Sequence, residues 1–271
     1  MRAAVLGSPI AHSLSPTLHR AGYAAAGLVG WEYDAHEVVP DGLATFVRGL
    51  GTEWRGLSLT MPLKEVAGSV ATTVDAVASR AAAVNTLVRR DDGGWDATNT
   101  DVVGLVRALA PHLGGAPERA LVLGAGATAR SAVLALAELG VVTVTVRARD
   151  PGRAADLLAW ALDHGIRNGS VAGLGPWVTT RDDVVVSTLP GSAGEAAAAT
   201  VPSAHRGTLL DVTYAGWPTP LGRAAEQAGM AVVSGLDLLV HQAAEQFRLY
   251  TGHEAPLEAM AAAGRAALGQ A

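Results

Sequence analysis

The sequence predicts an α/β fold with two domains, and three observations lead to this prediction. Short apolar segments alternate with helical segments along the 271 residues, which is typical of parallel sheets covered by helices. A glycine-rich turn at 124–129 joins one apolar segment to a helix. Hydrophobic residues make up 49% of the chain and charged residues 17%, so the chain can form a packed core.

The composition disfavours several classes of protein. Aromatic residues are only 4% of the chain and the net charge is −5, so the basic, aromatic surface of a nucleic-acid-binding protein is lacking. There is no cysteine, which excludes disulfides and thiolate chemistry. His12 and His19 lack metal-ligand spacing, so we expect no metal site. No segment is apolar enough for a signal peptide or a membrane span, and we expect a soluble, cytoplasmic protein.

The first hundred residues alternate between the signals of strands and helices. Ser15 stands where a helix cap is expected, and Pro16 follows at the first helical position. A hairpin is expected around 91–94, and a helix at 101–113. The earlier segments are predicted strands at 3–7, 31–38 and 56–60, and predicted helices at 15–28 and 42–50.

The second half of the chain repeats a strand–helix alternation. A strand, the glycine turn and a helix occupy 119–140, and four more apolar strands follow: "VTVTVRA", "DVVVSTLP", "GTLLDVTY" and "MAVVSG". Two helices, beginning at "GLDLLVHQ" and "PLEAM", end the chain and are expected to return to the first domain. We therefore predict one domain at 1–102 with 237–271, and a second domain at 103–236.

The glycine turn has the context of a dinucleotide-binding fingerprint. "GAGATA" follows a strand and opens a helix. Gly124 permits the tight turn, Gly126 lets a pyrophosphate approach the positive end of the helix, and Ala129 is small enough for close packing. The alternative is an ordinary strand-to-helix turn, but the context favours a cofactor.

The end of the next strand favours NADP over NAD. An NAD site usually has a carboxylate near Ala148, but here Arg147 and Arg149 flank that position and Arg153 follows. Guanidinium groups suit a 2′-phosphate because they are charged, bidentate donors. Asp150 lies close enough either to repel the phosphate or to hold an arginine in place.

A lysine and an aspartate could supply acid–base chemistry in the first domain. Lys64 follows the strand in "SLTMPLK", and Asp101 begins a helix in "NTDVVG". Both lie at the carboxyl ends of strands, where ligands collect. A lysine beside a carboxylate can donate a proton to a carbonyl oxygen. The alternative is a surface lysine and a helix-capping aspartate.

Four further residues have both a functional and a structural interpretation. Asn85 is either a turn residue or an amide directed at a hydroxyl. Tyr214 lies in a proline-bounded loop and is otherwise a half-buried aromatic residue. Gly235 would let the backbone approach a ligand, and Gln242 follows on a helix where a surface glutamine is the alternative.

Taken in order, these segments resemble shikimate dehydrogenase along nearly the whole chain. The resemblance is carried by "GSPIAHSLSP", "TMPLK", "AVNT", "NTDVVG", "GAGATAR", "TPL" and "GLDLLVHQA". It implies an N-terminal α/β substrate-binding domain, a Rossmann-type NADP-binding domain with a parallel sheet, and an active-site cleft between them. The implied reaction is the reversible reduction of 3-dehydroshikimate to shikimate with NADPH, a step of chorismate and aromatic amino-acid biosynthesis.

The resemblance also implies a role for individual residues. Lys64 and Asp101 would be the catalytic pair. Ser13 and Ser15 would bind the substrate carboxylate with Tyr214, since paired hydroxyl donors can satisfy both of its oxygens. The residues implied to contact ring hydroxyls are Thr60, Asn85, Asp101 and Gln242. The residues implied to bind the cofactor are Gly124, Ala125, Gly126, Ala127, Thr128, Arg149, Arg153, Val212 and Gly235.

Several positions depart from the family pattern. Ser58 stands where asparagine is usual, Ala148 and Asp150 stand where asparagine and threonine are usual, and "VSTLPGS" replaces "NATSxG". Quinate or aminoshikimate are alternative substrates, but quinate-preferring sites often have threonine at the position of Ser15. A non-catalytic dinucleotide sensor is a further alternative, against which the presence of both Lys64 and Asp101 argues. We expect a monomer or a homodimer, without a membrane or nucleic-acid partner.

Overall fold

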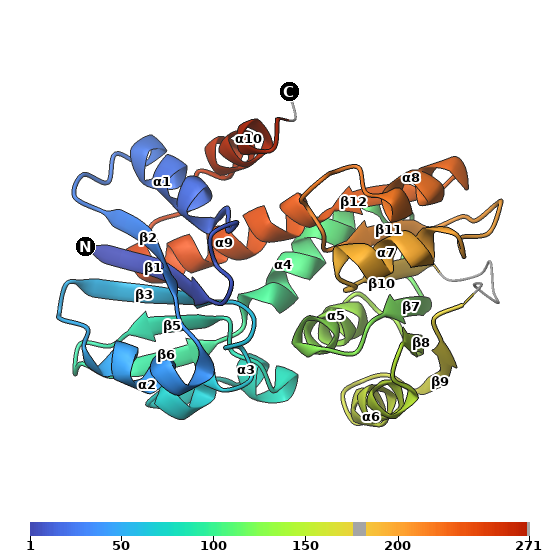
Figure 1. Cartoon of the computed structure of the whole chain (residues 1–271), viewed down its shortest axis with the longest axis horizontal. Helices are drawn as coiled ribbons and strands as arrows, with labels where there is room; N and C mark the ends of the chain where they lie inside the picture. Colours follow the sequence, from blue (N-terminus) through green and yellow to red (C-terminus); the bar gives the residue numbers. More distant parts are fainter. Residues whose placement is uncertain (176–182, 270–271) are drawn as a thin grey trace. The chain divides into compact units, whose positions relative to one another are not determined.

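The computed structural model describes residues 1–175 and 183–269, and the chain divides into two compact units (Figure 1). Unit 1 comprises Met1–Gly104 and Leu239–Ala271, and unit 2 comprises Leu105–Leu238. Within the described residues, no helix combines the length and the apolar character that a membrane span requires.

Unit 1 is built on a mixed six-stranded sheet with the order β2-β1-β3-β5-β6-β4. Strand β1 pairs in parallel with β2 and β3, whereas β5 runs antiparallel to both β3 and β6. The predicted hairpin is therefore confirmed as β5 and β6. The strands are β1 (Arg2–Gly7), β2 (Glu32–Glu37), β3 (Trp54–Leu59), β4 (Thr73–Val74), β5 (Thr86–Arg89) and β6 (Trp95–Thr98).

Two hydrophobic clusters cover the two faces of this sheet. Because side chains alternate along a strand, Ala4 and Leu6 of β1 join one cluster while Ala3 and Val5 join the other. The second cluster is aromatic and includes Phe247. The helices of unit 1 are α1 (Ser15–Ala25), α2 (Pro40–Arg48), α3 (Ala76–Ala81), the start of α4 (Thr100–Leu109), most of α9 (Gly235–Thr251) and α10 (Leu257–Ala267), with the short 3₁₀ segment η1 (Ala67–Val70).

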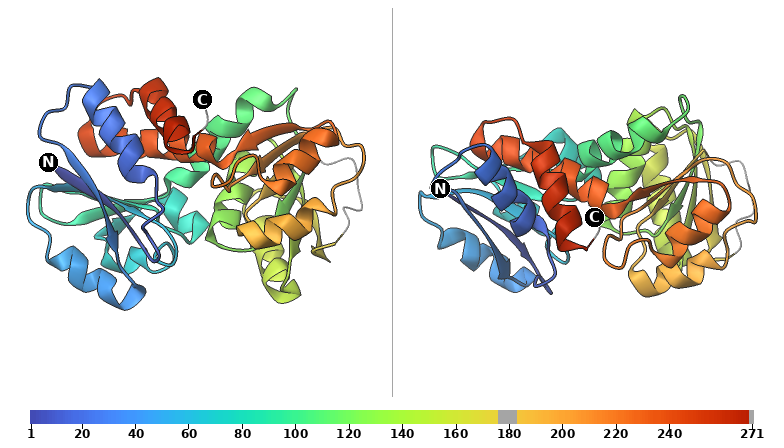
Figure 2. Two further views of the ribbon diagram at one scale, coloured as in Figure 1. Left: turned by 45° about the horizontal axis from the view of Figure 1, so that its top comes forward. Right: turned by 90° about the horizontal axis from the view of Figure 1, so that it is seen from above.

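The C-terminal helix α10 packs on α1, more than 200 residues earlier in the chain (Figures 1 and 2). Gly22 of α1 makes this close approach possible. A Cβ atom there would lie 3.1 Å from the ring of Phe247 and 3.3 Å from Met260, closer than ordinary van der Waals contact. The glycine therefore serves the packing of α1 against both terminal helices.

The predicted role of Ser15 as a helix cap is wrong. The N-cap of α1 is Leu14, and no side chain caps the helix. Ser15 is instead its first residue, and its N–H donates to Ser13 Oγ at 3.3 Å. The hydroxyl of Ser15 lies beside that of buried Tyr33 and interacts with it. Pro16 lies in the first turn, where its missing N–H costs nothing.

Unit 2 is built on a six-stranded parallel sheet with the order β12-β11-β10-β7-β8-β9. Its central strands are buried on both faces, which explains their uninterrupted apolar sequences. The strands are β7 (Arg119–Leu123), β8 (Thr143–Ala148), β9 (Asn168–Gly173), β10 (Val184–Ser187), β11 (Thr208–Asp211) and β12 (Ala231–Ser234).

Helices of unit 2 pack in two pairs against this sheet. One pair packs together beside β7, β8 and β9, and the other packs together beside β11 and β12 (Figure 1). The first pair is α5 (Ala127–Glu138) and α6 (Pro151–Leu162), and the second is α7 (Gly191–Ala198) and α8 (Pro220–Gln227). A short 3₁₀ segment, η2 (Ala110–His112), follows α4, so the helix predicted at 101–113 ends earlier as an α-helix.

The buried histidine of unit 1 makes its stability depend on pH. His19 is fully buried and stacks on Tyr33 with ring centroids 4.1 Å apart. Burial lowers the pKa of His19 to about 3, from 6.5. The unfolded chain therefore binds one more proton than the folded chain between these two values. The stabilising contribution of the neutral ring is complete above pH 6.5 and is lost progressively as the pH falls toward 3.

We expect His19→Phe, which keeps a ring on Tyr33, to remove this dependence. The free energy of unfolding of the unsubstituted protein should fall by about 1 kcal/mol more than that of the variant between about pH 6 and pH 5. Urea unfolding of both proteins at the two pH values measures the difference. Equal losses in the two proteins would show that His19 does not titrate as a buried neutral ring.

Candidate active site

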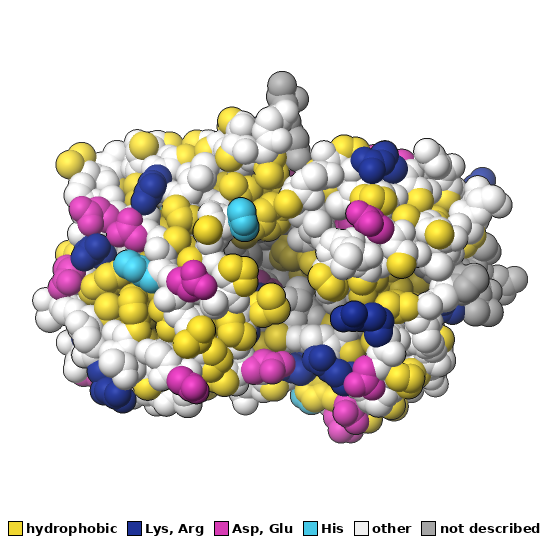
Figure 3. Space-filling model, viewed as in Figure 1, with side chains coloured by type: hydrophobic (Ala, Val, Ile, Leu, Met, Phe, Trp, Pro, Cys, Tyr) yellow, Lys and Arg dark blue, Asp and Glu magenta, His cyan; other side chains and the backbone are white. Residues whose placement is uncertain are grey.

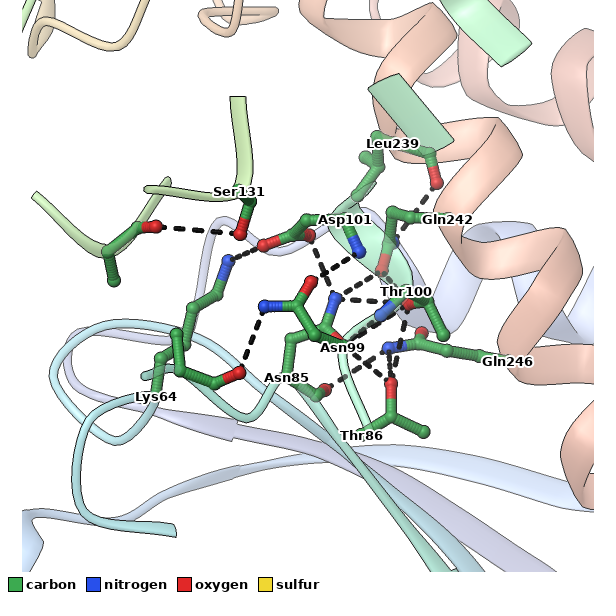
Figure 4. A network of polar contacts seen from close by, with 12 residues as sticks. Lys64, Asn85, Thr86, Asn99, Thr100, Asp101, Ser131, Leu239, Gln242 and Gln246 are labelled. Carbon is green, nitrogen blue, oxygen red and sulfur yellow. Dashed lines mark hydrogen bonds and ion pairs between the residues drawn. The ribbon is translucent and has the colours of Figure 1, made fainter. Parts of the chain in front are cut away.

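Lys64 and Asp101 form an ion pair in unit 1 (Figure 4). Lys64 lies in the turn that follows β3, and Asp101 lies in the first turn of α4. Lys64 Nζ is 2.6 Å from Asp101 Oδ2, and the two side chains are only 16% and 7% exposed. Because both partners are largely shielded from water, their attraction is screened far less than that of a surface pair.

Asp101 is held in place from three sides. Its second oxygen, Oδ1, accepts a hydrogen bond from Asn85 Nδ2 at 2.8 Å. Its backbone N–H donates to Asn99 Oδ1 at 3.0 Å, and Asn99 Nδ2 in turn donates to the carbonyl of Ala83 at 2.9 Å. The carboxylate also benefits from its place at the amino end of α4. One oxygen therefore faces the lysine while the other is fixed by an amide.

The turns that carry these residues are tied together by the backbone. The N–H of Val84 donates to the carbonyl of Lys64 at 2.7 Å, and the N–H of Asn85 donates to the carbonyl of Thr98 at 3.2 Å. These bonds align the ends of β3, β5 and β6 at one edge of the sheet. An ammonium group fixed on a carboxylate at such an edge can donate a proton to a ligand oxygen and take it back.

Asn85 and Gln242 lie beside the pair but are engaged by protein groups. Asn85 is 1% exposed, and its amide contacts Asp101, Thr100 and Gln242. Gln242 is 7% exposed, and its Nε2 donates to the carbonyl of Leu239 at 3.1 Å. The structure thus places both residues beside the Lys64–Asp101 pair, while their direct contact with ring hydroxyls stays a prediction.

The serines and Thr60 are placed by separate segments of unit 1. Ser13 is half-buried, and its oxygen accepts the N–H of Ser15, which leaves its own proton able to donate to a ligand. Ser15 is buried at 5% exposure. Thr60 begins the turn that leads to Lys64, and its N–H donates to the carbonyl of Leu6 at 2.9 Å. Tyr214 belongs to unit 2, where burial raises the pKa of its hydroxyl.

The glycine turn of unit 2 has the geometry of an anion site. Gly124 has φ +107°, and a side chain there would collide with Thr188, so only glycine fits. Gly126 is the N-cap of α5, and no atom lies within 4 Å of the place its Cβ would take. Ala129 is fully buried, as expected of the small residue at this position. Ala127 and Thr128 lie in the first turn of α5, where backbone N–H groups lack partners within the helix and favour an anion.

The arginines at the end of β8 differ in role. Arg153 Nη2 donates to the carbonyl of Ala125 at 3.3 Å, which places this guanidinium over the glycine turn. Arg149 is exposed. Arg147 is only 4% exposed and donates to the carbonyl of Gly175 at 2.6 Å, so its guanidinium holds the end of β9. The neighbouring carboxylate, Asp150, caps α6 by accepting the N–H of Gly152 at 2.8 Å, and among the residues that the structure describes it forms no ion pair with an arginine.

A pocket of about 320 Å³ lies beside Arg149, within the size range of small-molecule sites. It is lined by Ser192, Ala193 and Thr200 at and beyond α7. None of these residues is predicted from the sequence, because the segment before α7 departs from the family pattern. A hydroxyl-bearing helix that follows the carboxyl end of a parallel strand was the signal that could have indicated them.

Val212 and Gly235 lie at the carboxyl ends of β11 and β12. A Cβ atom at Gly235 would collide with the carbonyl of Val212. The glycine at this position is therefore required by the close approach of the two chain segments, and not by open space for a ligand. Contact of either residue with a cofactor stays a prediction.

A shielded lysine–carboxylate pair and a dinucleotide-type glycine turn on a parallel sheet define the class of dinucleotide-dependent oxidoreductases. Two family models match the chain: the shikimate dehydrogenase substrate-binding domain at residues 5–87, and the shikimate 5′-dehydrogenase C-terminal domain at 235–263. The described residues contain no group of three or more His, Asp or Glu that could hold a metal ion.

Curated proteins and solved structures agree with these matches. The shikimate dehydrogenase (NADP(+)) of Desulfitobacterium hafniense is 35% identical over 95% of this chain and 94% of its own length. The shikimate dehydrogenase structure from Mycobacterium tuberculosis is 42% identical, with a TM-score of 0.86 and coverage of 98% and 99%. The Thermus thermophilus enzyme, solved in complex with NADP(H) and shikimate, is 32% identical, with a TM-score of 0.85 and coverage of 99% and 100%. The chain belongs to the shikimate dehydrogenase family.

Proposed function

We propose that this chain catalyses the reversible reduction of 3-dehydroshikimate to shikimate with NADPH. The observation that carries the proposal is the ion pair of 2.6 Å between Lys64 and Asp101, shielded from water in unit 1. Membership of the shikimate dehydrogenase family supports it. So does the structure of the Thermus thermophilus relative with both shikimate and NADP(H).

Lys64 is the proposed proton donor. When bound, NADPH supplies a hydride to the carbonyl carbon of the substrate. The carbonyl oxygen then takes a proton from Lys64 Nζ, and together the hydride and the proton turn the ketone into a secondary alcohol. Asp101 holds the ammonium in place through Oδ2. In the reverse direction Lys64 accepts the hydroxyl proton as the hydride leaves. Such a positioned acid or base contributes about 10²- to 10⁴-fold to a rate.

The residues of unit 2 fit a phosphorylated dinucleotide. The open space at Gly126, at the amino end of α5, can receive a pyrophosphate. Arg149 and Arg153 can pair with a 2′-phosphate, since Asp150 is occupied in capping α6 and Arg153 already lies over the turn. The pocket beside Arg149 offers room for an adenine ring. The remaining cofactor residues implied by the resemblance belong to this proposal.

Ser13 is proposed to bind the substrate carboxylate, and we expect Ser13→Ala to raise the KM for shikimate. Loss of a hydrogen bond to a charged group costs about 1.5–3 kcal/mol, which corresponds to a roughly 10- to 100-fold rise. The KM for NADP should stay within about twofold, because Ser13 belongs to unit 1. Initial rates with varied shikimate measure the effect.

Ser8 offers a matched control for this substitution. It lies in the same opening motif, but its hydroxyl donates to Glu37 at 2.8 Å. Ser8→Ala should therefore leave the KM for shikimate close to that of the unsubstituted protein. A KM that rises equally in both variants would assign Ser13 a structural role.

Product analysis tests the reaction directly. The purified protein is incubated with 3-dehydroshikimate and NADPH, and the products are separated and identified. We expect one shikimate to form for each NADPH oxidised. NADPH consumption without shikimate, or no consumption at all, would contradict the proposal and favour an aminated substrate or a dinucleotide sensor. A cytoplasmic location, a cleft between two domains and the oligomeric state stay predictions.

A further inference from the structure

A buried chain of hydrogen bonds leads from the aromatic cluster of unit 1 to Asp101. It begins at Ser58, which is 3% exposed. The Ser58 hydroxyl accepts a hydrogen bond from the Tyr33 hydroxyl at 2.6 Å and donates to Gln246 Oε1 at 2.8 Å. The Tyr250 hydroxyl lies 3.1 Å from the Ser58 hydroxyl oxygen. Because a hydroxyl has a single proton, the bond to Gln246 fixes Tyr250 as a donor to Ser58.

The side-chain amide of Gln246 links these hydroxyl groups to β5 (Figure 4). With Oε1 accepting from Ser58, its Nε2 is left to donate, and it does so to Thr86 Oγ1 at 2.9 Å and to the carbonyl of Asn85 at 3.2 Å. Gln246 is 1% exposed and Thr86 is fully buried. Both side chains are therefore shielded from solvent and engaged by other protein groups.

The hydroxyl of Thr86 then fixes the amide of Asn85. It donates to Asn85 Oδ1 at 2.7 Å, and the backbone N–H of Thr100 donates to the same oxygen at 2.8 Å. With two donors on Oδ1, Asn85 can present only Nδ2 to Asp101. A reversed amide would place its carbonyl oxygen against the carboxylate and would turn Nδ2 toward the two donors, which would then lack an acceptor at this position.

We infer that Gln246 and Thr86 are positioning residues for the catalytic pair. Their hydrogen bonds hold the Asn85 amide with Nδ2 on Asp101 Oδ1, which leaves Oδ2 directed at Lys64. Each bond in the series polarises the next. This inference rests on the proposed function, and it adds two buried residues of β5 and α9 to the determinants of the reaction rate.

Ser58 determines the donor-to-acceptor direction of this series of hydrogen bonds. Serine provides one donor and accepts from both tyrosines, so Gln246 receives a donor at Oε1. The usual asparagine of the family at this position would offer an amide instead. The same helix, α9, also carries Gln242, one turn before Gln246. One helix thus supplies both a candidate substrate-binding residue and a residue that orients the catalytic pair.

Isosteric substitutions separate positioning from packing. Thr86→Val keeps the branched shape of the side chain and removes its hydroxyl, whereas Thr86→Ser keeps the hydroxyl and removes a methyl group. We expect Thr86→Val to lower kcat roughly tenfold. Thr86→Ser should restore most of the rate although it leaves a small cavity. The KM for NADP should not change in either variant, because its proposed site lies in unit 2.

Gln246→Met tests the other end of the series, and the double variant tests whether the two residues act together. Residues that act through one network are not additive. The kcat of Gln246→Met with Thr86→Val should therefore equal that of the slower single variant. Thermal unfolding of each variant gives the loss of stability separately, so that a change in folding is not mistaken for a change in rate.

Two results would overturn the inference alone. One is an unchanged kcat in Thr86→Val while the unsubstituted protein turns over shikimate. The other is multiplied losses in the double variant, which would show independent packing effects. Absence of turnover by the unsubstituted protein would overturn the proposed function and this inference with it.

Discussion

Replacement of Lys64 by Ala is expected to lower kcat for shikimate oxidation by about 10²- to 10⁴-fold, the range for loss of a positioned acid or base. The KM for NADP should change by less than about twofold, because the proposed cofactor residues belong to unit 2. Steady-state rates at the nicotinamide absorbance band measure both quantities. A kcat within a few-fold of the unsubstituted protein would contradict the acid–base role of Lys64.

Lys64→Arg is the control that separates charge from proton transfer. The sequence contains 20 lysine and arginine residues, and Lys64 is the only lysine. An arginine keeps the positive charge beside Asp101, but a guanidinium does not release its proton at ordinary pH. We therefore expect Lys64→Arg to be nearly as slow as Lys64→Ala. Near-normal turnover by Lys64→Arg would mean that the position needs only a cation.

Replacement of Arg149 by Ala is expected to raise the KM for NADP about 10- to 100-fold. A charge-assisted pair with a phosphate contributes about 1.5–3 kcal/mol, which gives this range. Since NAD lacks the 2′-phosphate, the KM for NAD should stay nearly constant in the variant. The ratio of the two KM values, measured with saturating shikimate, reports the preference for NADP.

An arginine outside the proposed site gives the matched control. Arg206 is exposed and lies in unit 2, just before β11 and so near the amino ends of the strands, opposite the glycine turn. Arg206→Ala removes the same net charge from the same unit and should leave the KM for NADP unchanged. Equal effects of the two substitutions would indicate that net charge alone governs NADP binding. Figure 3 shows charged side chains of both signs scattered over the viewed face.

Local sequence patterns predicted the strands and helices whose side chains are either uniformly buried or regularly alternate between buried and exposed. The central strands of unit 2 are buried on both faces, and their apolar sequences are unambiguous. The turn at Gly124 was also predicted, from a glycine between a strand and a helix. The structure explains this glycine, because a φ of +107° and the closeness of Thr188 exclude any other residue. The pairing of Lys64 with Asp101 was predicted because each residue follows a strand. In the structure Lys64 Nζ lies 2.6 Å from Asp101 Oδ2.

Elements without such a pattern were missed. Strand β9 has the sequence "NGSVAG" and lies at the edge of its sheet with mostly exposed side chains, so neither hydrophobicity nor alternation indicates it. Its pairing with β8 is what fixes its conformation. The two-residue strand β4 is likewise fixed by its pairing with β6. The short helix α3 does have a local signal, the N-cap Asp75, whose side chain accepts the N–H of Ala78 at 2.7 Å.

Other side-chain contacts between distant segments could not be predicted. Ser58 and Gln246 are 188 residues apart, yet their side chains share a hydrogen bond in the core of unit 1. No sequence pattern distinguishes Arg147, which is buried and donates to the carbonyl of Gly175, from the exposed Arg149. Such roles depend on the path of the chain in three dimensions and not on the spacing of residues along it.

The proposed reaction is tested most directly by a small matrix of substrates and cofactors. The purified protein is mixed with shikimate or quinate and with NADP or NAD, and the formation of reduced nicotinamide is followed. We expect the highest kcat/KM with shikimate and NADP. Replacing shikimate by quinate, or NADP by NAD, should clearly lower kcat/KM. Turnover of quinate but not shikimate, or no turnover in any combination, would contradict the proposed function.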